Sequence, residues 1–209
     1  MGPPDKPGDD ELREGRYWGA PFYERPAFPM VRLNFSRRYS MAHRLLHDAA
    51  SKCLTPHGHD EVVTVTLRPL TAMDLGAGNM SASFARAKGS WHAWIDDWVD
   101  HALQLGAEDP LLGYFQAHEP NQLSRIMVFR GDPTTEALAI AFFRKLSALL
   151  ADGGLFAVDS VSVQETPTNG VIVTAGDMDA LDGWSPGDWA TRADASLNDL
   201  LPAAAWSRP

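Results

Sequence analysis

The residue types best suited to chemistry lie close together in the first third of the chain. Cys53 is the only cysteine, His57 and His59 follow it, and His43 lies ten residues before it. In an extended segment, residues two positions apart point to the same face, so the imidazoles of His57 and His59 can converge on one ion. With His43 they would form a three-nitrogen set that leaves a fourth position open, as catalytic zinc sites do. The spacing therefore predicts a Zn²⁺ centre beside a reactive thiol.

The composition of the chain is that of an ordinary globular protein. Its 209 residues carry a formal net charge of −9, with 22% charged and 44% hydrophobic residues, so one domain with tails can bury a substantial core. The acidic balance argues against nucleic acid as a partner, because neutralising phosphates needs a basic stripe. No apolar run approaches the ~20 residues of a transmembrane helix, so we expect no membrane partner. The amino terminus lacks the pattern of a signal peptide, and we expect a cytoplasmic protein.

Four strands are indicated by alternating apolar residues and by β-branched runs. The histidine block leads directly into the second strand, and Asn169-Gly170 is a strong hairpin signal between the last two. The strands are expected over residues 31–36, 61–67, 158–166 and 171–175.

Two helices are expected between these strand pairs. The first has Ser90 as N-cap, carries Asp100 and His101, and ends at Gly106, because large apolar residues recur there at helical spacing. The second has Asp132 as N-cap and proline at its first position. The order β-β-α-α-β-β predicts an α+β domain, with a four-stranded antiparallel sheet and two helices on one face.

The ends of the chain differ from its middle. Residues 1–28 are rich in proline, glycine and mixed charge without apolar periodicity, which predicts an irregular N-terminal arm. Residues 29–176 form the predicted domain. Residues 177–209 are rich in proline, aspartate and alanine, and we expect a loosely attached C-terminal tail.

Six short blocks of the sequence carry a resemblance to a known family. They are Phe35-Ser-Arg-Arg-Tyr-Ser-Met-Ala-His43, Cys53-x-x-x-His57-Gly-His59, Met73-Asp-Leu75, Asp100-His101, Asp132-Pro-Thr-Thr-Glu136 and Val163-Gln-Glu165-Thr166. Taken in order, over roughly residues 31–176, they resemble the signature blocks of the 6-pyruvoyl-tetrahydropterin synthase and 6-carboxy-tetrahydropterin synthase family.

The resemblance implies a fold, an assembly and a substrate. The fold is the tunnelling fold (T-fold), whose subunits form a barrel-like trimer, and two trimers form a homohexamer with active sites at subunit interfaces. The substrate is 7,8-dihydroneopterin triphosphate, the cofactor is Zn²⁺, and the reaction releases tripolyphosphate.

The resemblance also implies roles for single residues. His43, His57 and His59 match the zinc ligands, and Cys53 matches the thiol that exchanges protons with the side-chain carbons of the substrate. His101 matches the relay partner of this thiol. Asp100 would orient His101, because a carboxylate fixes the tautomer of an imidazole.

The remaining matched residues concern the pterin and the phosphates. Glu165 matches the pterin anchor, since a carboxylate accepts two parallel N–H bonds from a guanidine-like edge. Thr135 and Glu136 match a segment lining that pocket, although Glu136 could merely complement the helix dipole. Basic side chains could meet the triphosphate or be simply solvated. They are Arg37, Arg38, Arg44 and Lys52.

Departures from the family pattern concern two places. Asp60 and Glu61 stand where the family more often has Asn or Ser followed by an aromatic residue, and a carboxylate there could change the hydrogen bonding around the metal. The stretch around residues 75–90 is longer than expected, which is consistent with an insertion that forms a lid or an interface loop.

The leading hypothesis is a 6-carboxy-tetrahydropterin synthase, which would also release acetaldehyde and feed 7-deazapurine synthesis, as in the queuosine precursor pathway. The nearest alternative retains the three-carbon side chain and yields 6-pyruvoyl-tetrahydropterin. A thiol hydrolase using Cys53, His101 and Asp100 is a second class of enzyme. A non-catalytic assembly protein, in which zinc only stabilises an interface, is a third possibility.

Overall fold

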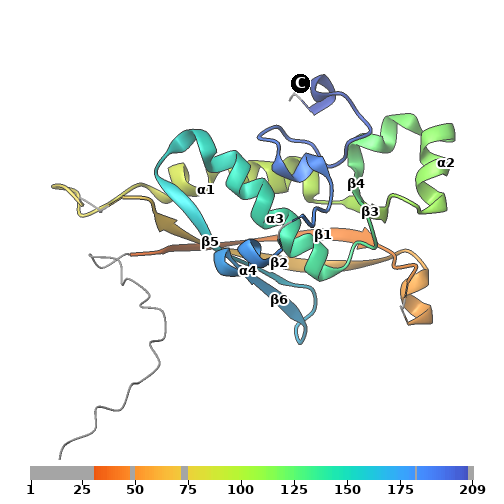
Figure 1. Ribbon diagram of the computed structural model, residues 1–209, viewed down its shortest axis with the longest axis horizontal. Helices are drawn as coiled ribbons and strands as arrows, with labels where there is room; N and C mark the ends of the chain where they lie inside the picture. The colour runs from red at the N-terminus through yellow and green to blue at the C-terminus, as the bar shows by residue number, and fades with distance from the viewer. Residues whose placement is uncertain (1–30, 48–49, 72–74, 182, 207–209) are drawn as a thin grey trace, which may run out of the picture.

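The structure is a computed structural model, and it describes residues 31–47, 50–71, 75–181 and 183–206. The expected arm over residues 1–28 and the pair Met73-Asp74 lie outside this part of the chain. A sheet forms the base of the molecule, and the longest helices lie across one of its faces (Figure 1). The fold is therefore mixed α+β, as predicted.

The sheet has six strands in the order β4-β3-β1-β2-β5-β6. Neighbouring strands are antiparallel from β1 to β6, whereas β3 pairs with both β1 and β4 in parallel. Their bounds are β1 Leu33–His43, β2 His57–Pro69, β3 Ala102–Gly106, β4 Ile126–Phe129, β5 Phe156–Gln164 and β6 Gly170–Thr174.

The helices begin at side chains that accept backbone N–H bonds. Ser83, Asp109, Thr134 and Thr174 are these N-caps, so the first helix begins before the predicted Ser90 and the long one after the predicted Asp132. Their bounds are α1 Phe84–Trp94, α2 Pro110–His118, α3 Thr135–Leu150 and α4 Ala175–Ala180. A π-helical turn, Ile95–Val99, continues α1, and short 3₁₀ turns cover Ser51–Leu54, Pro120–Arg125, Ala151–Gly153, Asp188–Thr191 and Ala203–Trp206.

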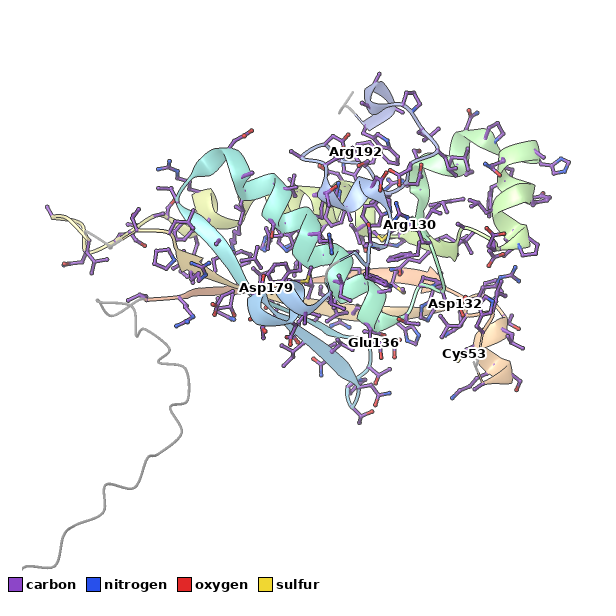
Figure 2. All side chains as sticks on the ribbon, viewed as in Figure 1. Cys53, Arg130, Asp132, Glu136, Asp179 and Arg192 are labelled. Carbon is purple, nitrogen blue, oxygen red and sulfur yellow. The ribbon has the colours of Figure 1, made fainter. Side chains whose placement is uncertain are left out.

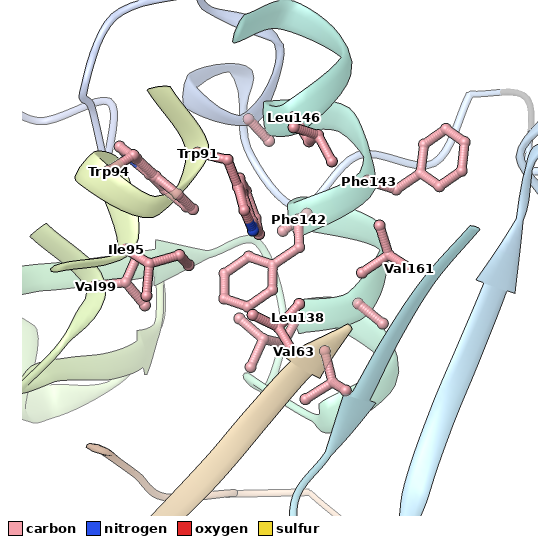
Figure 3. Close-up of a cluster of buried hydrophobic side chains, with 14 of the residues drawn as sticks. Val63, Trp91, Trp94, Ile95, Val99, Leu138, Phe142, Phe143, Leu146 and Val161 are labelled. Carbon is pink, nitrogen blue, oxygen red and sulfur yellow. The ribbon is translucent and has the colours of Figure 1, made fainter. Parts of the chain in front are cut away.

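The main core lies between the sheet and helices α1 and α3. Phe142 of α3 is fully buried and packs edge-on against Trp91 and Trp94 of α1, with ring centroids 5.3 and 5.7 Å apart. Val63 of β2 and Val161 of β5 face the same cluster (Figure 3). Burying a side chain of this size contributes about 1.5–3 kcal/mol, so this layer holds the two helices on the sheet.

The predicted four-stranded sheet is wrong, because residues 102–129 add two parallel strands and helix α2. This inserted segment has a small core of its own, formed by Leu105, Leu112, Leu123 and Ile126. The first helix was expected to continue to Gly106. It ends instead before His101, whose backbone φ of 67° lies in the left-handed region and cannot continue a helix.

The expected loose attachment of residues 177–209 is also wrong for the described residues 183–206. Trp189, Leu197 and Trp206 are buried in the main core. The indole of Trp189 donates a hydrogen bond to the carbonyl of Val128 at 2.7 Å. The buried ammonium of Lys145 on α3 donates to two carbonyls and a hydroxyl of residues 192–196. The many polar and small residues of this segment gave no indication that its few large apolar side chains are buried.

Within the described residues, no helix combines the length and the apolar character needed to cross a membrane.

Candidate metal centre and active site

Three imidazoles meet at the end of the β1–β2 hairpin. His43 and His57 are register partners across the two strands, and His59 is two residues further along β2 on the same face. One nitrogen from each ring lies within 4.8 Å of the other two. The predicted convergence of the three histidines is therefore confirmed, and these residues are placed to hold a metal ion.

Two backbone carbonyls orient the rings. His43 donates its Nδ1 proton to the carbonyl of Pro133 at 2.9 Å, and His57 donates its Nδ1 proton to the carbonyl of Thr55 at 3.0 Å. In this tautomer both Nε2 atoms are acceptors, yet they face each other at 3.1 Å. Two lone pairs at this distance repel unless a cation lies between them. Tetrahedral Zn–N bonds of about 2.0–2.1 Å separate their nitrogens by roughly 3.3 Å, so the arrangement fits such an ion.

Burial and close packing support the same centre. Burial lowers the pKa of His43, which is 2% exposed, and this favours the neutral ring that a metal requires. Between the two β2 ligands, a Cβ at Gly58 would lie 2.8 Å from the carbonyl oxygen of Met41. Glycine therefore allows β1 and β2 to approach closely enough for the three rings to meet.

The two carboxylates that follow His59 point to opposite faces. Asp60 is exposed and pairs with Arg38, away from the metal face. Glu61 is buried and accepts a hydrogen bond from the hydroxyl of Tyr39 at 2.5 Å. Burial raises the pKa of Glu61 to about 7. Neither carboxylate forms a hydrogen bond with His59 within the described residues, so the expected effect of these two residues on the ligand is not seen.

A cavity of about 420 Å³ opens beside the three imidazoles. Cys53 and Glu165 both face it, so the structure brings the thiol and the predicted pterin anchor to the metal ligands. Glu165 accepts a hydrogen bond from the hydroxyl of Thr135 at 2.7 Å, which places Thr135 behind the anchor. The residues lining the cavity are His43, Leu45, Lys52, Cys53, His57, His59, Glu165, Thr166 and Asn169.

Cys53 lies on a short 3₁₀ turn beyond the ends of β1 and β2 (Figure 2). The carbonyl of Cys53 accepts a hydrogen bond from the N–H of Leu45 at 2.9 Å, which fastens this turn to the chain that leaves β1. The thiol is partly exposed. A partly exposed thiol beside a cavity can exchange protons with a bound molecule, whereas a thiol buried in hydrocarbon cannot.

Asp100 and His101 do not line this cavity. The π-helical turn ends at Asp100, whose carboxylate accepts the N–H of Ser40 at 2.8 Å, and the N–H of His101 donates to the carbonyl of Ser40 at 2.7 Å. The pair is thus fixed to the outer edge of β1. His101 Nδ1 lies 2.9 Å from an Asp100 oxygen, and the His101 side chain is 78% exposed. The predicted orienting contact is present, but the imidazole faces outward.

Glu136 also lies elsewhere. It lines a separate hollow of about 400 Å³ on the other side of the first turn of α3, together with Arg130 and Trp184. The expected contact of Glu136 with the pterin pocket is therefore wrong within one chain. Asp132, expected to cap α3, instead accepts the backbone N–H groups of Leu46 and His47.

Three of the four basic residues considered for the triphosphate are paired with carboxylates. Arg37 pairs with Asp96, Arg38 with Asp60, and Arg44 with the buried Asp109. Lys52 is the one lysine or arginine that lines the cavity within the described residues.

The sequence did not assign the backbone partners or three lining residues, Leu45, Thr166 and Asn169. Thr55 and Pro133 lie inside two of the quoted blocks, but every residue has a carbonyl, so residue type could not single them out. Thr166, which ends another block, and Asn169 form the tip of the β5–β6 hairpin, whose position the Asn-Gly turn indicated.

The family model described as 6-pyruvoyl tetrahydropterin synthase matches residues 32–176. Because the match covers more than half of the chain, the protein belongs to the 6-pyruvoyl tetrahydropterin synthase family. Enzymes of this family are lyases that act on pterins, and they bind a metal ion. No curated protein sequence matches the chain.

Three solved structures are similar to the chain, and the first of them supports the fold. An uncharacterized protein from Wolinella succinogenes is 21% identical, with a TM-score of 0.57, over 71% of this chain and 99% of that one. The 6-pyruvoyl tetrahydropterin synthase of Caenorhabditis elegans is 24% identical, with a TM-score of 0.49, over 70% and 96% of the two chains. The enzyme from Plasmodium vivax is 15% identical, with a TM-score of 0.49, over 70% and 98%. At 21% identity, the Wolinella structure indicates the fold and not the function.

Proposed function

We propose that the protein is a zinc-dependent lyase that converts 7,8-dihydroneopterin triphosphate to 6-carboxy-5,6,7,8-tetrahydropterin, with release of acetaldehyde and tripolyphosphate. One observation carries this proposal: three converging imidazoles, a partly exposed thiol and a carboxylate line a single cavity. The product would be a precursor of 7-deazapurines, as in queuosine synthesis, and the setting would be cytoplasmic.

Glu165 would anchor the pterin. Its carboxylate can accept two parallel N–H bonds from the guanidine-like edge of the ring. The hydroxyl of Thr135 donates to one of its oxygens and so holds the carboxylate in place. The pterin side chain would then extend toward the imidazoles and Cys53, which line the same cavity.

His43, His57 and His59 would hold the zinc ion, which supplies a positive charge that stabilises negative charge developing on the side-chain oxygens of the substrate. Cys53 would move a proton at the side-chain carbons from the same side of the cavity. Lys52, adjacent to the thiol, is placed to contact the triphosphate. The three paired arginines are not part of this proposal.

His101 would act in the cavity of a neighbouring subunit. Its Nδ1 atom lies 2.9 Å from an Asp100 oxygen, so Nε2 would be the atom that exchanges a proton with a thiol. Within the described residues, β1 has no strand partner along Leu33–Tyr39 on the side away from β2, and β6 has none on the side away from β5. The two strands run in opposite directions, so β6 of one copy can pair with β1 of the next and continue the antiparallel sheet β1-β2-β5-β6.

This pairing would bring the two halves of the site together. His101 lies at the carboxyl end of the open part of β1, and the hairpin tip with Glu165 and Asn169 lies at the amino end of β6. In an antiparallel pair these ends are neighbours. The arrangement supports a ring of subunits with shared active sites, and we propose the homohexamer of two trimers as the assembly.

The separation of Cys53 from His101 disfavours a thiol hydrolase within one chain. The turn of Cys53 is fastened at Leu45 and the His101 backbone at Ser40, which are five residues apart and on the order of 15 Å in an extended chain. A nucleophile and its base must lie within hydrogen-bond reach.

The test is turnover by protein whose zinc content has been measured. Purified protein is incubated with 7,8-dihydroneopterin triphosphate, with and without a chelator, and tripolyphosphate, acetaldehyde and the pterin product are followed. We expect all three products, and their loss with the chelator. Tripolyphosphate without acetaldehyde would identify the 6-pyruvoyl product instead. Absence of any zinc-dependent turnover would refute the proposed lyase.

A further inference from the structure

Gln104 lies at the centre of β3 and is completely buried. It is the register partner of His43 on β1 and of Met127 on β4. Laterally paired residues in a sheet point to the same face, so the Gln104 side chain lies on the face that carries the three imidazoles. The amide is therefore the lateral neighbour of a candidate metal ligand.

The packing of β3 agrees with this orientation. Ala102, two residues before Gln104, belongs to the main core, whereas Leu105 belongs to the small core on the opposite face. Alternation along a strand then places Gln104 with Ala102 on the main-core side. Gln104 is among the few polar residues that are fully buried there.

The amide of Gln104 is unpaired. Neither its Oε1 nor its Nε2 has a hydrogen-bond partner within the described residues, although both atoms are buried. Burying an unpaired amide is unfavourable, and an apolar side chain would avoid it. Met127, its neighbour in the same row, shows that an apolar side chain of similar length is accommodated at this depth. A structural role alone does not explain a glutamine here.

The carbonyl that orients the neighbouring His43 ring can accept a second hydrogen bond from an amide. His43 is held by one hydrogen bond, from its Nδ1 to the carbonyl of Pro133. A carbonyl oxygen has a second lone pair, and metal-binding histidines depend on partners of this kind for their orientation. We propose that Gln104 is a positioning residue for His43, whose amide completes the polar surroundings of the ring when the ion is bound. This inference rests on the proposed metal centre.

The test measures zinc affinity without substrate. Metal-free full-length protein is titrated with Zn²⁺ against a competing chromophoric chelator, and the thermal midpoint of the metal-free protein is recorded. For Gln104→Met, which keeps length and removes the amide, we expect zinc binding weaker by about 10- to 100-fold. The midpoint should be equal to or above that of the wild type, because an unpaired polar group is removed. The matched control Met127→Leu should bind zinc as the wild type does.

A further variant separates polarity from packing. Gln104→Asn keeps the amide donor without adding charge, and it should bind zinc at least about tenfold more tightly than Gln104→Met. Affinity of Gln104→Met within twofold of the wild type would overturn the inference. Equal weakening in Gln104→Met and Met127→Leu would also overturn it, since packing of the row would then be the cause. If the wild-type protein binds no zinc, the proposed function itself is refuted. If the wild type binds zinc and Gln104→Met binds it equally well, only the role of Gln104 is refuted.

Discussion

Two of the three imidazoles of the candidate centre are oriented by backbone carbonyls. His43 is buried and donates to Pro133, whereas His57 is partly exposed and donates to Thr55, only two residues away. Both hydrogen bonds leave Nε2 toward the centre, so these two rings are already in the tautomer that a metal requires. Removing one ring should therefore remove a candidate ligand without rearranging the hairpin.

His57→Ala should therefore lower the affinity for zinc by at least about 100-fold, because a two-nitrogen site no longer defines a tetrahedral centre. His47→Ala is the matched control, since His47 is exposed and contacts Asp132 instead. Zinc retained after dialysis against a weak chelator gives the measurement. Equal zinc content in the two variants would contradict the assignment of His57 as a ligand.

Cys53→Ala should lower turnover by about 10²- to 10⁴-fold, the usual effect of removing a group that transfers protons. Zinc content should be unchanged, because the thiol lines the cavity and is outside the three-nitrogen set. Steady-state rates and metal analysis on the same preparation provide both readouts. Unchanged turnover would contradict the assignment of Cys53 as the group that transfers protons.

Much of this site could be predicted from residue types and spacing, because ligands on one short hairpin are positioned by strand geometry. The questions that the sequence left open concern residues whose partners are distant in the sequence. Glu136 lies on a helix face that spacing alone could not orient, and Arg44 is occupied by Asp109, which belongs to the inserted segment. Local patterns carry no information about such partners.

At the scale of elements, the inserted segment is joined to β1 by an ion pair. Arg44 directly follows the candidate ligand His43, and Asp109 is the N-cap of α2. Although burial tends to raise it, the pKa of Asp109 is held below its usual value by hydrogen bonds from Arg44 and the Leu111 N–H and by the charge of Arg44. The pair links β3 and α2 to the end of β1.

Arg44→Met should lower the free energy of unfolding at pH 7 by about 2 kcal/mol. This is less than for a fully buried pair, because the Arg44 side chain keeps 17% of its exposure. Stability from a carboxyl with a lowered folded pKa is present above about pH 4 and is lost as the pH falls through that pKa. The difference between variant and wild type should therefore shrink at pH 3. Urea unfolding at both pH values measures it, and a difference that grows in acid would contradict this reading.

The C-terminal segment is an integral element of the fold. Trp189 is fully buried, and its hydrogen bond to Val128 fastens the segment along the outer strand β4. Trp189→Ala should cost about 3–5 kcal/mol, as large-to-small changes in a core do. Trp184→Ala is a suitable control, because Trp184 is 41% exposed. Chemical denaturation of both variants tests this, and similar stabilities would show that the segment is loosely attached after all.

The long hairpins and α3 could be predicted because their apolar periodicity extends over many residues. The short parallel strands β3 and β4 could not. Each has five residues or fewer, and each is stabilised by a neighbour far away in the sequence. For β3, the helical spacing of the tryptophans also continues to Ala102, the first residue of the strand. The end of the helix therefore depended on the left-handed backbone of His101, which the spacing does not indicate.

At the scale of the whole molecule, the sheet has edges of different kinds. The β4 edge is covered, because Val128 and Arg130 donate backbone hydrogen bonds to the C-terminal segment. The β6 edge is open, and Ile172 there is 67% exposed. An open edge with an exposed apolar residue is a surface to which another strand can add. This asymmetry supports a ring closed through β6 and β1.

If active sites are shared between subunits, two inactive variants should complement each other. Cys53→Ala and His101→Ala, each inactive alone, are unfolded together, refolded as mixed oligomers and assayed. Some interfaces then pair an intact thiol with an intact imidazole, so activity should return to about a quarter of the wild-type level for random mixing. Mixing without refolding is the control. Absence of recovery in verified mixed oligomers would place both groups in one subunit.

We infer that one zinc ion is held by the three histidines beside Cys53. A crystal structure of the zinc-loaded protein, with diffraction data collected on both sides of the zinc absorption edge, would locate this ion. We expect one strong anomalous peak per subunit, within about 2.0–2.1 Å of one nitrogen from each of His43, His57 and His59. A peak elsewhere, or none at these rings in zinc-loaded crystals, would contradict it.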